Sequence, residues 1–512
     1  MLDVLSNKKT ALAAAGGLAA IGVFALLMAH PALAQTVAAP AAAAAAAPAA
    51  PPPPVPNKGD TAWMLVATAL VLMMSIPGLG LFYGGLVRTK NMLSVLSQVF
   101  MIVSMVGIVW VVYGYSMALG DTPQGGWSWF IGGFGKKFLM GITPSSIWGT
   151  FTPGVYIPEL VYMVFQMTFA MITPALIVGA FAERMKFSAV VAFMLLWVTF
   201  IYFPIAHWVW ATPTPDDIVG AAKELAAATT DAAKKAAQDK LDGIMSGAGW
   251  LWSLGALDFA GGTVVHINAG IAGLVGCLMI GKRVGLGKET MAPHSLVMSW
   301  IGASMLWVGW FGFNAGSNLE ANGVTALAFV NTMVATAAAA LSWMVFEWVF
   351  KGKPSMLGMA SGAVAGLVAV TPASGFAGPM GAVVLGLVVS PVCLFFVSSV
   401  KSMFGYDDAL DVFGVHCIGG IIGALGTGIL VAPYLGGTGL TDYTAKDLTG
   451  TYNMGTQLWI QFKAVASVLI WSGVGSAVIY ALVGAVIGLR VKDDAEREGL
   501  DVIDHGERAY NS

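Results

Sequence analysis

The chain has 512 residues, of which 57% are hydrophobic and only 10% are charged, and its formal net charge at pH 7 is −2. A soluble domain carries about 25% charged residues, so this composition excludes a soluble globular protein and indicates an integral membrane protein. The slightly negative net charge points to no nucleic-acid partner.

The chain opens with a segment, 1–34, that has the form of a secretory signal peptide. Two lysines precede an apolar stretch at 11–28, and the Ala-Leu-Ala sequence at 32–34 offers a small-x-small cleavage site. The alternative is an uncleaved first membrane helix. Residues 35–60 are dominated by Ala and Pro, which predicts an extended low-complexity linker.

The next segment, 61–491, contains eleven apolar stretches that are each long enough to cross a hydrocarbon layer of ~30 Å. They are predicted at 61–86, 92–119, 157–182, 187–210, 260–281, 295–313, 325–350, 356–371, 379–402, 412–432 and 462–491. Lys and Arg gather in alternate connections, which predicts that those connections are cytoplasmic. We therefore expect an all-α integral membrane protein with its N-terminus outside and its C-terminus inside.

The connection at 211–257 is the longest of those expected outside. Ala, Lys and Asp dominate its sequence from 217 to 241, and their composition predicts an external helix or a helical hairpin. The weakly apolar Ala-rich face would suit a small lid or a partner-contact element, although a solvated insertion without a transport role is favoured. The sequence leaves these alternatives open.

Two histidines, His266 and His416, lie in the middle of apolar runs and open related phrases, His-Ile-Asn-Ala-Gly-Ile-Ala-Gly and His-Cys-Ile-Gly-Gly-Ile-Ile-Gly. An ionisable side chain at membrane depth is costly and usually functional. Each histidine alone could be a satisfied core residue, but the matching placement favours a duplicated membrane protein with a polar site between its halves. Two facing imidazoles can share or pass a proton.

A metal site is not expected at these histidines. No third His, Cys or carboxylate is paired with them in the same register. The three cysteines, Cys277, Cys393 and Cys417, all fall in apolar segments without clustered spacing, which is typical of small packing residues.

A carboxylate and several aromatic residues are expected near the outer ends of the spans. Asp258 precedes His266 by eight residues, which is about 12 Å along a helix, and could hold a cation, cap the helix start, or do both. By topology, Trp210 and Ser317 come out near the external face. An aromatic face attracts a small cation by ~0.5–2 kcal/mol. The alternative is an interfacial aromatic belt.

Three stretches resemble the signatures of the ammonium transporter (Amt/Mep/Rh) family, specifically its bacterial Amt branch. They are Asp258-Phe-Ala-Gly-Gly-Thr-Val-Val-His-Ile-Asn, Gly309-Trp-Phe-Gly-Phe-Asn-Ala-Gly-Ser and Asp411-Val-Phe-Gly-Val-His. The resemblance extends from about Thr61 to the tail. It implies eleven transmembrane helices in a five-plus-five inverted repeat, a homotrimer with one pore per subunit, and a place in the bacterial inner membrane.

The resemblance also implies a transporter of ammonium and methylammonium, with no enzymatic activity and no cofactor. It implies an outer substrate-binding site at Phe169, Trp210 and Ser317, a stacked gate at Phe169 and Phe313, and a deprotonation and pore set at Asp258, His266, His416, Gln166, Phe165 and Trp310. The last segment, 492–512, is similar to the cytoplasmic tail through which PII-type signalling proteins regulate the family. The long loop at 211–257 departs from the usual short connection, which affects the expected shape of the outer mouth.

Electrostatics favours the transport of the neutral molecule. Moving a bare cation into a low-dielectric pore costs up to ~20 kcal/mol in the idealised limit, and several kcal/mol after relaxation. We therefore expect ammonium to lose its proton near Asp258 and ammonia to cross the pore. The proton either returns outside, as in an ammonia channel, or passes inward through the histidine pair. A further alternative is an ammonium sensor that signals through its tail.

Overall fold

The computed structural model describes residues 54–120 and 127–510. The predicted signal peptide and residues 35–53 of the predicted linker lie outside the described residues. Within the described part, ten helical runs are long and apolar enough to cross a membrane, and α14 (Met356–Val370) is a shorter apolar helix. This confirms the predicted all-α multi-pass fold, whereas the expected count of eleven spans depends on the short helix α14.

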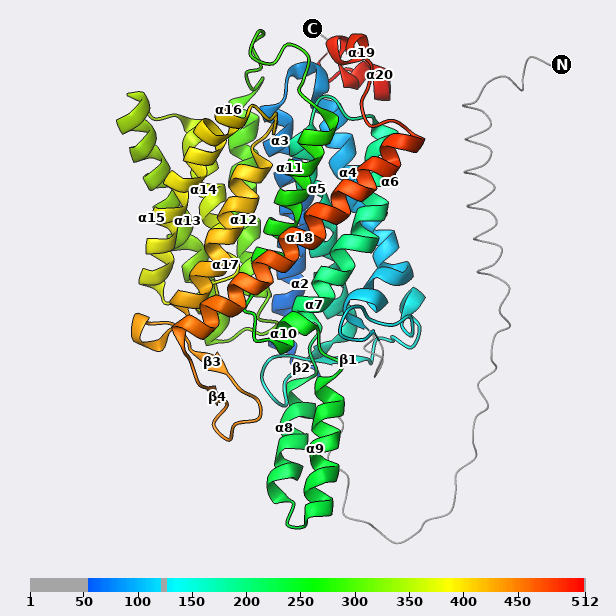
Figure 1. The fold of residues 1–512 in the computed structure, drawn as a ribbon, viewed down its shortest axis with the longest axis vertical. Coiled ribbons are helices and arrows are strands. Elements are labelled where there is room, and N and C mark those ends of the chain that lie inside the picture. The colour runs from blue at the N-terminus through cyan, green and yellow to red at the C-terminus, as the bar shows by residue number, and fades with distance from the viewer. Residues whose placement is uncertain (1–53, 121–126, 511–512) are drawn as a thin grey trace, which may run out of the picture. The chain divides into compact units, whose positions relative to one another are not determined.

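Each predicted span overlaps one of these helices, and the largest shift is at the last one. The long runs are α2–α3 (Lys58–Leu86), α4 with its flanking turns (Thr89–Gly114), α5 (Glu159–Phe181), α6–α7 (Phe187–Trp210), α11 with its preceding turn (Gly262–Ile280), α12 (Leu296–Gly316), α13 (Gly323–Lys351), α15–α16 (Pro379–Phe404), α17 with its preceding turn (Phe413–Leu430) and α18 (Met454–Val486). Helix α18 begins at Met454 instead of 462, and its 33 residues cross the bundle obliquely (Figure 1).

Small residues allow the helices of this bundle to approach closely. A Cβ atom added at Gly312 of α12 would lie only 2.6 Å from the carbonyl oxygen of Ala67 in α2. Helix α12 packs on α2 and α3, while α13 packs on α14 and α15. Such contacts are typical of membrane helices, whose association depends on close van der Waals packing.

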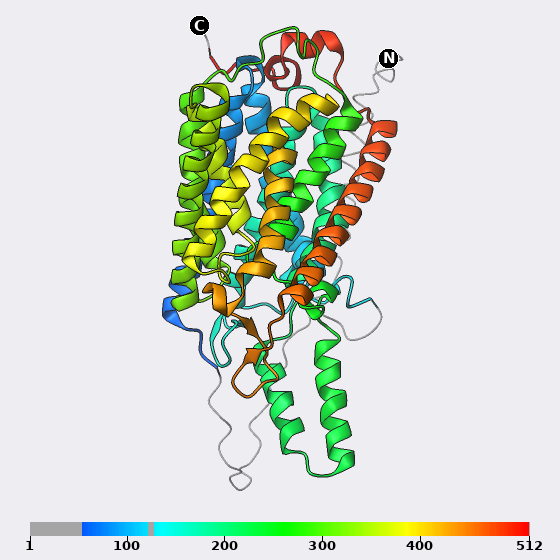
Figure 2. The same cartoon turned by 60° about the vertical axis from the view of Figure 1, so that its left-hand side comes forward.

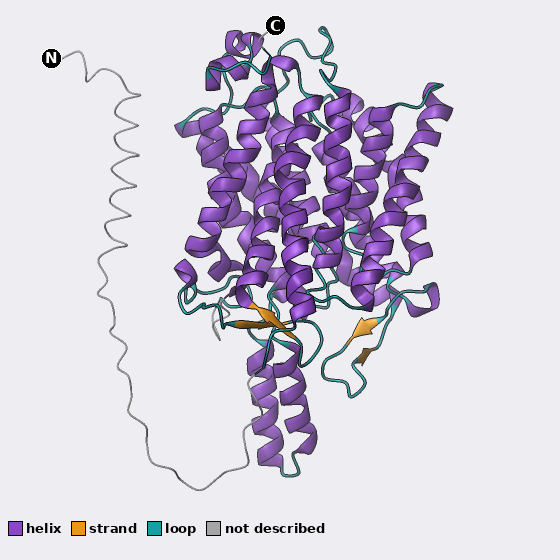
Figure 3. Cartoon of the chain, turned by 180° about the vertical axis from the view of Figure 1, so that it is seen from behind, coloured by secondary structure: helices purple, strands orange, loops and turns teal. Residues whose placement is uncertain are grey.

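The connection after α7 forms the helical hairpin that its composition predicts. Its helices are α8 (Pro215–Ala227), α9 (Asp231–Met245) and the short α10 (Trp250–Ser253). Ile218 and Ala221 of α8 pack against Leu241 of α9 in a small apolar core of their own. Figures 1 and 3 show the α8–α9 hairpin extending away from one end of the bundle, which we call the hairpin end.

Two short β-hairpins also lie at the hairpin end. Strand β1 (Ile147–Gly149) pairs antiparallel with β2 (Tyr156–Pro158), and β3 (Leu440–Thr441) pairs antiparallel with β4 (Thr449–Gly450). The Asp216 carboxylate of α8 accepts hydrogen bonds from the backbone N–H of Gly154 (2.9 Å) and the Tyr156 hydroxyl (2.6 Å). These bonds hold the α8–α9 hairpin to the β1–β2 hairpin.

The chain ends in two short helices at the opposite end of the bundle, which we call the tail end. They are α19 (Asp493–Glu498) and α20 (Leu500–His505) (Figure 2). Asp501 accepts a hydrogen bond from the Ser94 N–H at the start of α4 (2.8 Å). Glu496 accepts one from the Val284 N–H after α11 (2.6 Å). The C-terminal segment with α19 and α20 therefore packs on the start of α4 and on the connection after α11.

Candidate pore

The two predicted histidines meet at the centre of the bundle. His266 lies in a π-helical turn (Gly262–Ile267) at the start of α11, and His416 lies in the corresponding turn (Phe413–Cys417) before α17. Their Nδ1 atoms are 3.2 Å apart, and the ring planes are inclined by only 18°. Both side chains are buried. One ring must donate and the other accept in this contact, as expected for a pair that can pass a proton.

Reciprocal glycine contacts surround the pair. A Cβ atom at Gly270 would lie 2.6 Å from the Cβ of Cys417, and a Cβ atom at Gly420 would lie 3.0 Å from Cγ1 of Ile267. Gly270 and Gly420 follow their histidines by the same number of residues, and so do Ile267 and Cys417. The two turns therefore pack on each other in the same way from both sides. This arrangement accords with the expected repeat, which remains a prediction.

A continuous column of rings connects the histidines to the hairpin end. His266 stacks on Trp310 (centroid distance 5.3 Å) and also contacts Phe313 (6.1 Å). Phe313 stacks on Phe169 at 4.2 Å, and Phe169 meets Trp210 edge-on at 5.6 Å. The structure thus brings the predicted gate, His266 and both aromatic residues of the predicted outer site into one column.

Phe165 and Ser317, two further predicted residues, contact members of this column. Phe165 meets Phe169 edge-on at 5.0 Å, and the indole N–H of Trp310 donates to the Thr371 hydroxyl (2.8 Å). The Ser317 hydroxyl donates to the carbonyl oxygen of Phe313 (2.8 Å), so its oxygen lone pairs can still accept a hydrogen bond. The buried Oε1 of Gln166 has no hydrogen-bond partner among the described residues.

Asp258 caps the turn that carries His266, which confirms the capping interpretation. Oδ1 accepts hydrogen bonds from the N–H groups of Gly261 (2.8 Å) and Gly262 (2.6 Å). Oδ2 accepts from the N–H groups of Thr263 (2.8 Å) and Val264 (3.2 Å), and from the Thr263 hydroxyl. Burial raises the pKa of Asp258, and these bonds oppose that effect.

The expected separation of about 12 Å along one helix is wrong, because residues 258–261 are not helical. Gly261 has φ 117°, a left-handed conformation that glycine adopts without strain, and the helical run begins only at Gly262. The carbonyl oxygen of Asp258 accepts a hydrogen bond from the Trp210 indole N–H (3.0 Å). The same short segment therefore caps the first turn and holds Trp210.

A narrow apolar cavity lies next to the histidines. Its volume is about 10 Å³, which is room for about one water-sized molecule. It is lined by Met74, Leu79, Phe82, Tyr83, Ile172, Leu176, Val265, His266, Leu306, Trp310, Phe313, Val364 and His416. Most of these residues were missed by the sequence analysis, because Leu, Ile, Val and Met on a pore wall look the same as those that face lipid.

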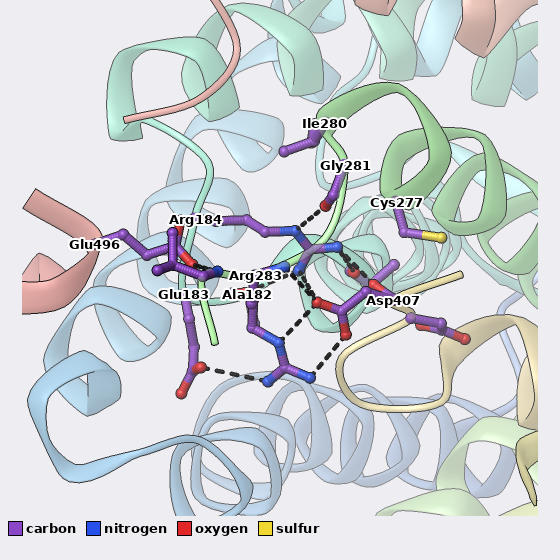
Figure 4. Close-up of polar contacts among 12 residues, drawn as sticks. Ala182, Glu183, Arg184, Cys277, Ile280, Gly281, Arg283, Asp407 and Glu496 are labelled. Carbon is purple, nitrogen blue, oxygen red and sulfur yellow. Dashed lines mark hydrogen bonds and ion pairs between the residues drawn. The ribbon is translucent and has the colours of Figure 1, made fainter. Parts of the chain in front are cut away.

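A buried charge network holds the helix ends at the tail end (Figure 4). Asp407 accepts hydrogen bonds from the backbone N–H (2.8 Å), Nε (3.0 Å) and Nη2 (2.8 Å) of Arg283. Arg283 also contacts Glu183 (3.3 Å), and the guanidinium of Arg184 donates to the backbone carbonyl of Gly281 (2.8 Å). The sequence analysis used such residues only to orient the connections and missed this network.

Comparisons with known proteins agree with this geometry. Residues 62–510 match the Ammonium Transporter Family. The chain is 45% identical over 457 residues to the ammonium transporter of Aquifex aeolicus, covering 89% of this chain and 94% of that protein. It is 40% identical over 457 residues to the ammonium transporter of Bacillus subtilis, covering 88% and 98%.

Two solved structures have the same fold. Mep2 of Saccharomyces cerevisiae aligns with a TM-score of 0.69 at 31% identity, covering 86% of this chain and 91% of that chain. A structure described as Sensor Amt Protein aligns with a TM-score of 0.71 at 25% identity, covering 87% and 98%. The family match spans nearly all of the described residues, and it includes both pore histidines. The chain therefore belongs to the ammonium transporter family.

Proposed function

We propose that this protein binds ammonium at the hairpin end, removes its proton and conducts ammonia past the histidine pair, while the histidines carry the proton inward. One observation above all supports this proposal: His266 and His416 are hydrogen-bonded to each other and line an apolar cavity of about one small molecule. An apolar cavity is a poor site for a bare cation, whose desolvation costs several kcal/mol. Neutral ammonia avoids that cost.

The outer substrate-binding site is proposed at Phe169, Trp210 and Ser317. The two rings meet at 5.6 Å, and the Ser317 hydroxyl keeps its lone pairs as acceptors. Aromatic faces and a hydroxyl oxygen suit a small cation with N–H donors, for which each aromatic contact contributes ~0.5–2 kcal/mol. Phe169 then stacks with Phe313, so the gate lies directly behind this site.

Deprotonation is proposed near Asp258, before the substrate enters the apolar part. The Asp258 carboxylate provides negative charge close to the outer site, since the backbone carbonyl of the same residue accepts a hydrogen bond from the Trp210 indole N–H. Potassium has no proton to lose, so the same route selects against it. Phe165, Gln166 and Trp310 complete the proposed pore wall.

We further propose that the protein works as a homotrimer in a bacterial inner membrane, with the hairpin end outside. Exposed apolar residues on α13 and α15 support contact with acyl chains or with further copies of the chain: Val330, Met333, Leu341, Val384, Leu387 and Val388. The packed tail, α19–α20, supports regulation at the tail end by a PII-type protein. Methylammonium is expected as a second substrate.

The test is an ammonium concentration jump applied to proteoliposomes, with current and internal pH recorded together. A sustained current that is evoked by ammonium and not by potassium, and that loses this specificity in the His266→Ala, His416→Ala double variant, would support inward proton relay. A rise of internal pH without current would indicate an electroneutral ammonia channel. A sensor would give neither signal but would bind a PII-type protein in an ammonium-dependent way. The likeness to a structure described as Sensor Amt Protein is the specific reason to test this alternative.

The matched control for the histidine variants is His294→Ala. His294 lies in the connection between α11 and α12 at the tail end, where its Nδ1 contacts the backbone carbonyl of Val87 (2.9 Å). It has no place in the ring column. Loss of ammonium specificity in this variant as well would point to a general defect of folding rather than to the relay.

A further inference from the structure

A second buried aspartate occupies the position that matches Asp258 in the other half of the chain. Asp408 precedes His416 by eight residues, just as Asp258 precedes His266. Its side chain is only 1% exposed. Oδ1 accepts a hydrogen bond from the Val412 N–H (3.0 Å), and Oδ2 accepts one from the Phe413 N–H (2.8 Å). Each aspartate therefore caps the turn that carries a pore histidine.

The two caps differ in how completely the carboxylate is occupied. Asp258 accepts four backbone N–H groups and the Thr263 hydroxyl, whereas Asp408 accepts two backbone N–H groups. The position of Thr263 is taken by Phe413, which has no hydroxyl to donate. A carboxylate that accepts few hydrogen bonds loses less when it binds a proton. The cap at the tail end is therefore the one better suited to proton exchange.

The neighbouring charges separate Asp408 from the two other aspartates nearby. Asp407 is bound by Arg283, and although burial alone would raise its pKa, these hydrogen bonds lower it (Figure 4). The Asp411 carboxylate accepts a hydrogen bond from Lys401 Nζ (2.6 Å). At Asp408 the same Nζ donates to the backbone carbonyl (2.7 Å) and not to the carboxylate. Burial raises the pKa of Asp408 to about 6, against the opposing charge of Lys401. Adjacent carboxylates in such different environments are typical of proton-transfer sites.

The Asp408 segment lies directly behind the wall of the cavity. A Cβ atom at Gly179 would lie 2.7 Å from Cγ2 of Val412 and 2.8 Å from Cζ of Tyr83, and Tyr83 lines the cavity. The backbone N–H of Leu410 donates to the carbonyl oxygen of Gly179 (3.0 Å). The charged and titratable groups that act on Asp408, or on which its charge acts, are Lys401, Asp411, Tyr83, Tyr406 and Cys277.

We infer that Asp408 is the inner proton-exchange group of the pore, which receives the relayed proton and returns it to ammonia at the tail end. The inference rests on the proposed inward relay through the histidines. The carboxylate first binds the proton released from the histidine pair. Its O–H bond then breaks as a new N–H bond forms at the lone pair of ammonia, so that ammonium leaves and the carboxylate is restored.

The experiment records ammonium-evoked current in proteoliposomes while the internal pH is varied between about 5 and 8. In the unaltered protein, inward current should fall as the internal pH drops through about 6, because internal protons then occupy Asp408 and it cannot receive the relayed one. Asp408→Asn keeps an acceptor oxygen for the cap and removes the titrating group. We expect its current to fall at least tenfold and its dependence on internal pH to disappear.

The matched variant is Asp411→Asn, which leaves Asp408 in place. Asp411 raises the pKa of Asp408, so its removal should retain the current and shift the pH-dependent fall to a lower internal pH. This variant decides the question even if Asp408→Asn fails to fold. An unshifted fall in Asp411→Asn, or an unchanged current and pH profile in Asp408→Asn, would overturn the role of Asp408 while leaving transport intact. No current in the unaltered protein would overturn both proposals.

Discussion

Replacing Asp258 by alanine removes the acceptor for five hydrogen bonds at once, and we expect a large loss of stability. Four of the donors are buried backbone N–H groups, and each unsatisfied donor costs about 1–3 kcal/mol. The simple sum is about 4–12 kcal/mol, from which relaxation and entering water recover a part. We therefore expect Asp258→Ala to lower the free energy of unfolding by about 4 kcal/mol or more, against about 0.5–2 kcal/mol for an ordinary helix cap.

The measurement is the free energy of unfolding of purified protein in detergent, paired with transport in proteoliposomes. Thr263→Val is the matched control, because it removes only the hydroxyl donor and should cost about 1 kcal/mol. If the cap is the main role of Asp258, loss of transport in the alanine variant should accompany loss of folded protein. A variant that lost transport while unfolding within about 1 kcal/mol of the unaltered protein would refute this reasoning and assign the carboxylate directly to the substrate.

Three further outcomes are expected. The His266→Ala, His416→Ala double variant should lose ammonium specificity and admit potassium, measured as potassium-evoked current; unchanged ion selectivity would argue against the relay. Trp210→Leu should raise the ammonium concentration for half-maximal current by about 2- to 30-fold, the equivalent of a cation–π contact of ~0.5–2 kcal/mol; an unaltered concentration dependence would return Trp210 to the aromatic belt. Because hydrogen bonds from Arg283 lower the pKa of Asp407 against the effect of burial, its contribution to stability is present above the ordinary Asp pKa of 3.8 and is lost as the pH falls through the lowered one. Asp407→Asn should abolish this acid-dependent part of the unfolding free energy; an identical pH profile of stability in the variant would argue against this role of Asp407.

The membrane helices were predictable from the sequence because a long apolar run in lipid has few structural solutions. Backbone groups in the hydrocarbon layer must bond within the segment, so a helix is the outcome. The pairing of His266 with His416 was also predictable, since each one opens a related phrase and the matching placement favoured a polar site between two halves of the chain. The stack of Phe169 on Phe313 was expected from the family resemblance alone.

Helix starts were less predictable where polar side chains bond to distant backbone. The stretch before the predicted start of α18 contains Gln457 and Gln461, which lower its hydropathy. In the structure both are buried, and Gln461 exchanges hydrogen bonds with the backbone of Leu257 (2.7 and 2.8 Å). The helix therefore extends to Met454. A pattern of hydropathy cannot register such long-range partners.

Site residues were predictable from the sequence where their side chains are chemically distinctive. They were not predictable where only the packing of the helices determines which apolar residues line the cavity. Leu176 and Leu306 line the cavity, while Leu341 on α13 is exposed, and nothing in their local sequence separates these leucines. The network around Arg283 and Asp407 joins residues 124 positions apart. Only the tertiary arrangement brings these groups together.

The direct Nδ1–Nδ1 contact gives the two histidines two possible tautomeric arrangements, in which either ring donates and the other accepts. If His266 donates at Nδ1, its Nε2 is free to take a proton from the hairpin end while His416 can release one from its own Nε2. After one proton has passed, both tautomers are exchanged, and His416 donates to His266. A second proton cannot follow until the rings are reset. Under the proposed relay, protons would therefore pass this pair one at a time, with a reset of both rings between them, rather than as a continuous stream.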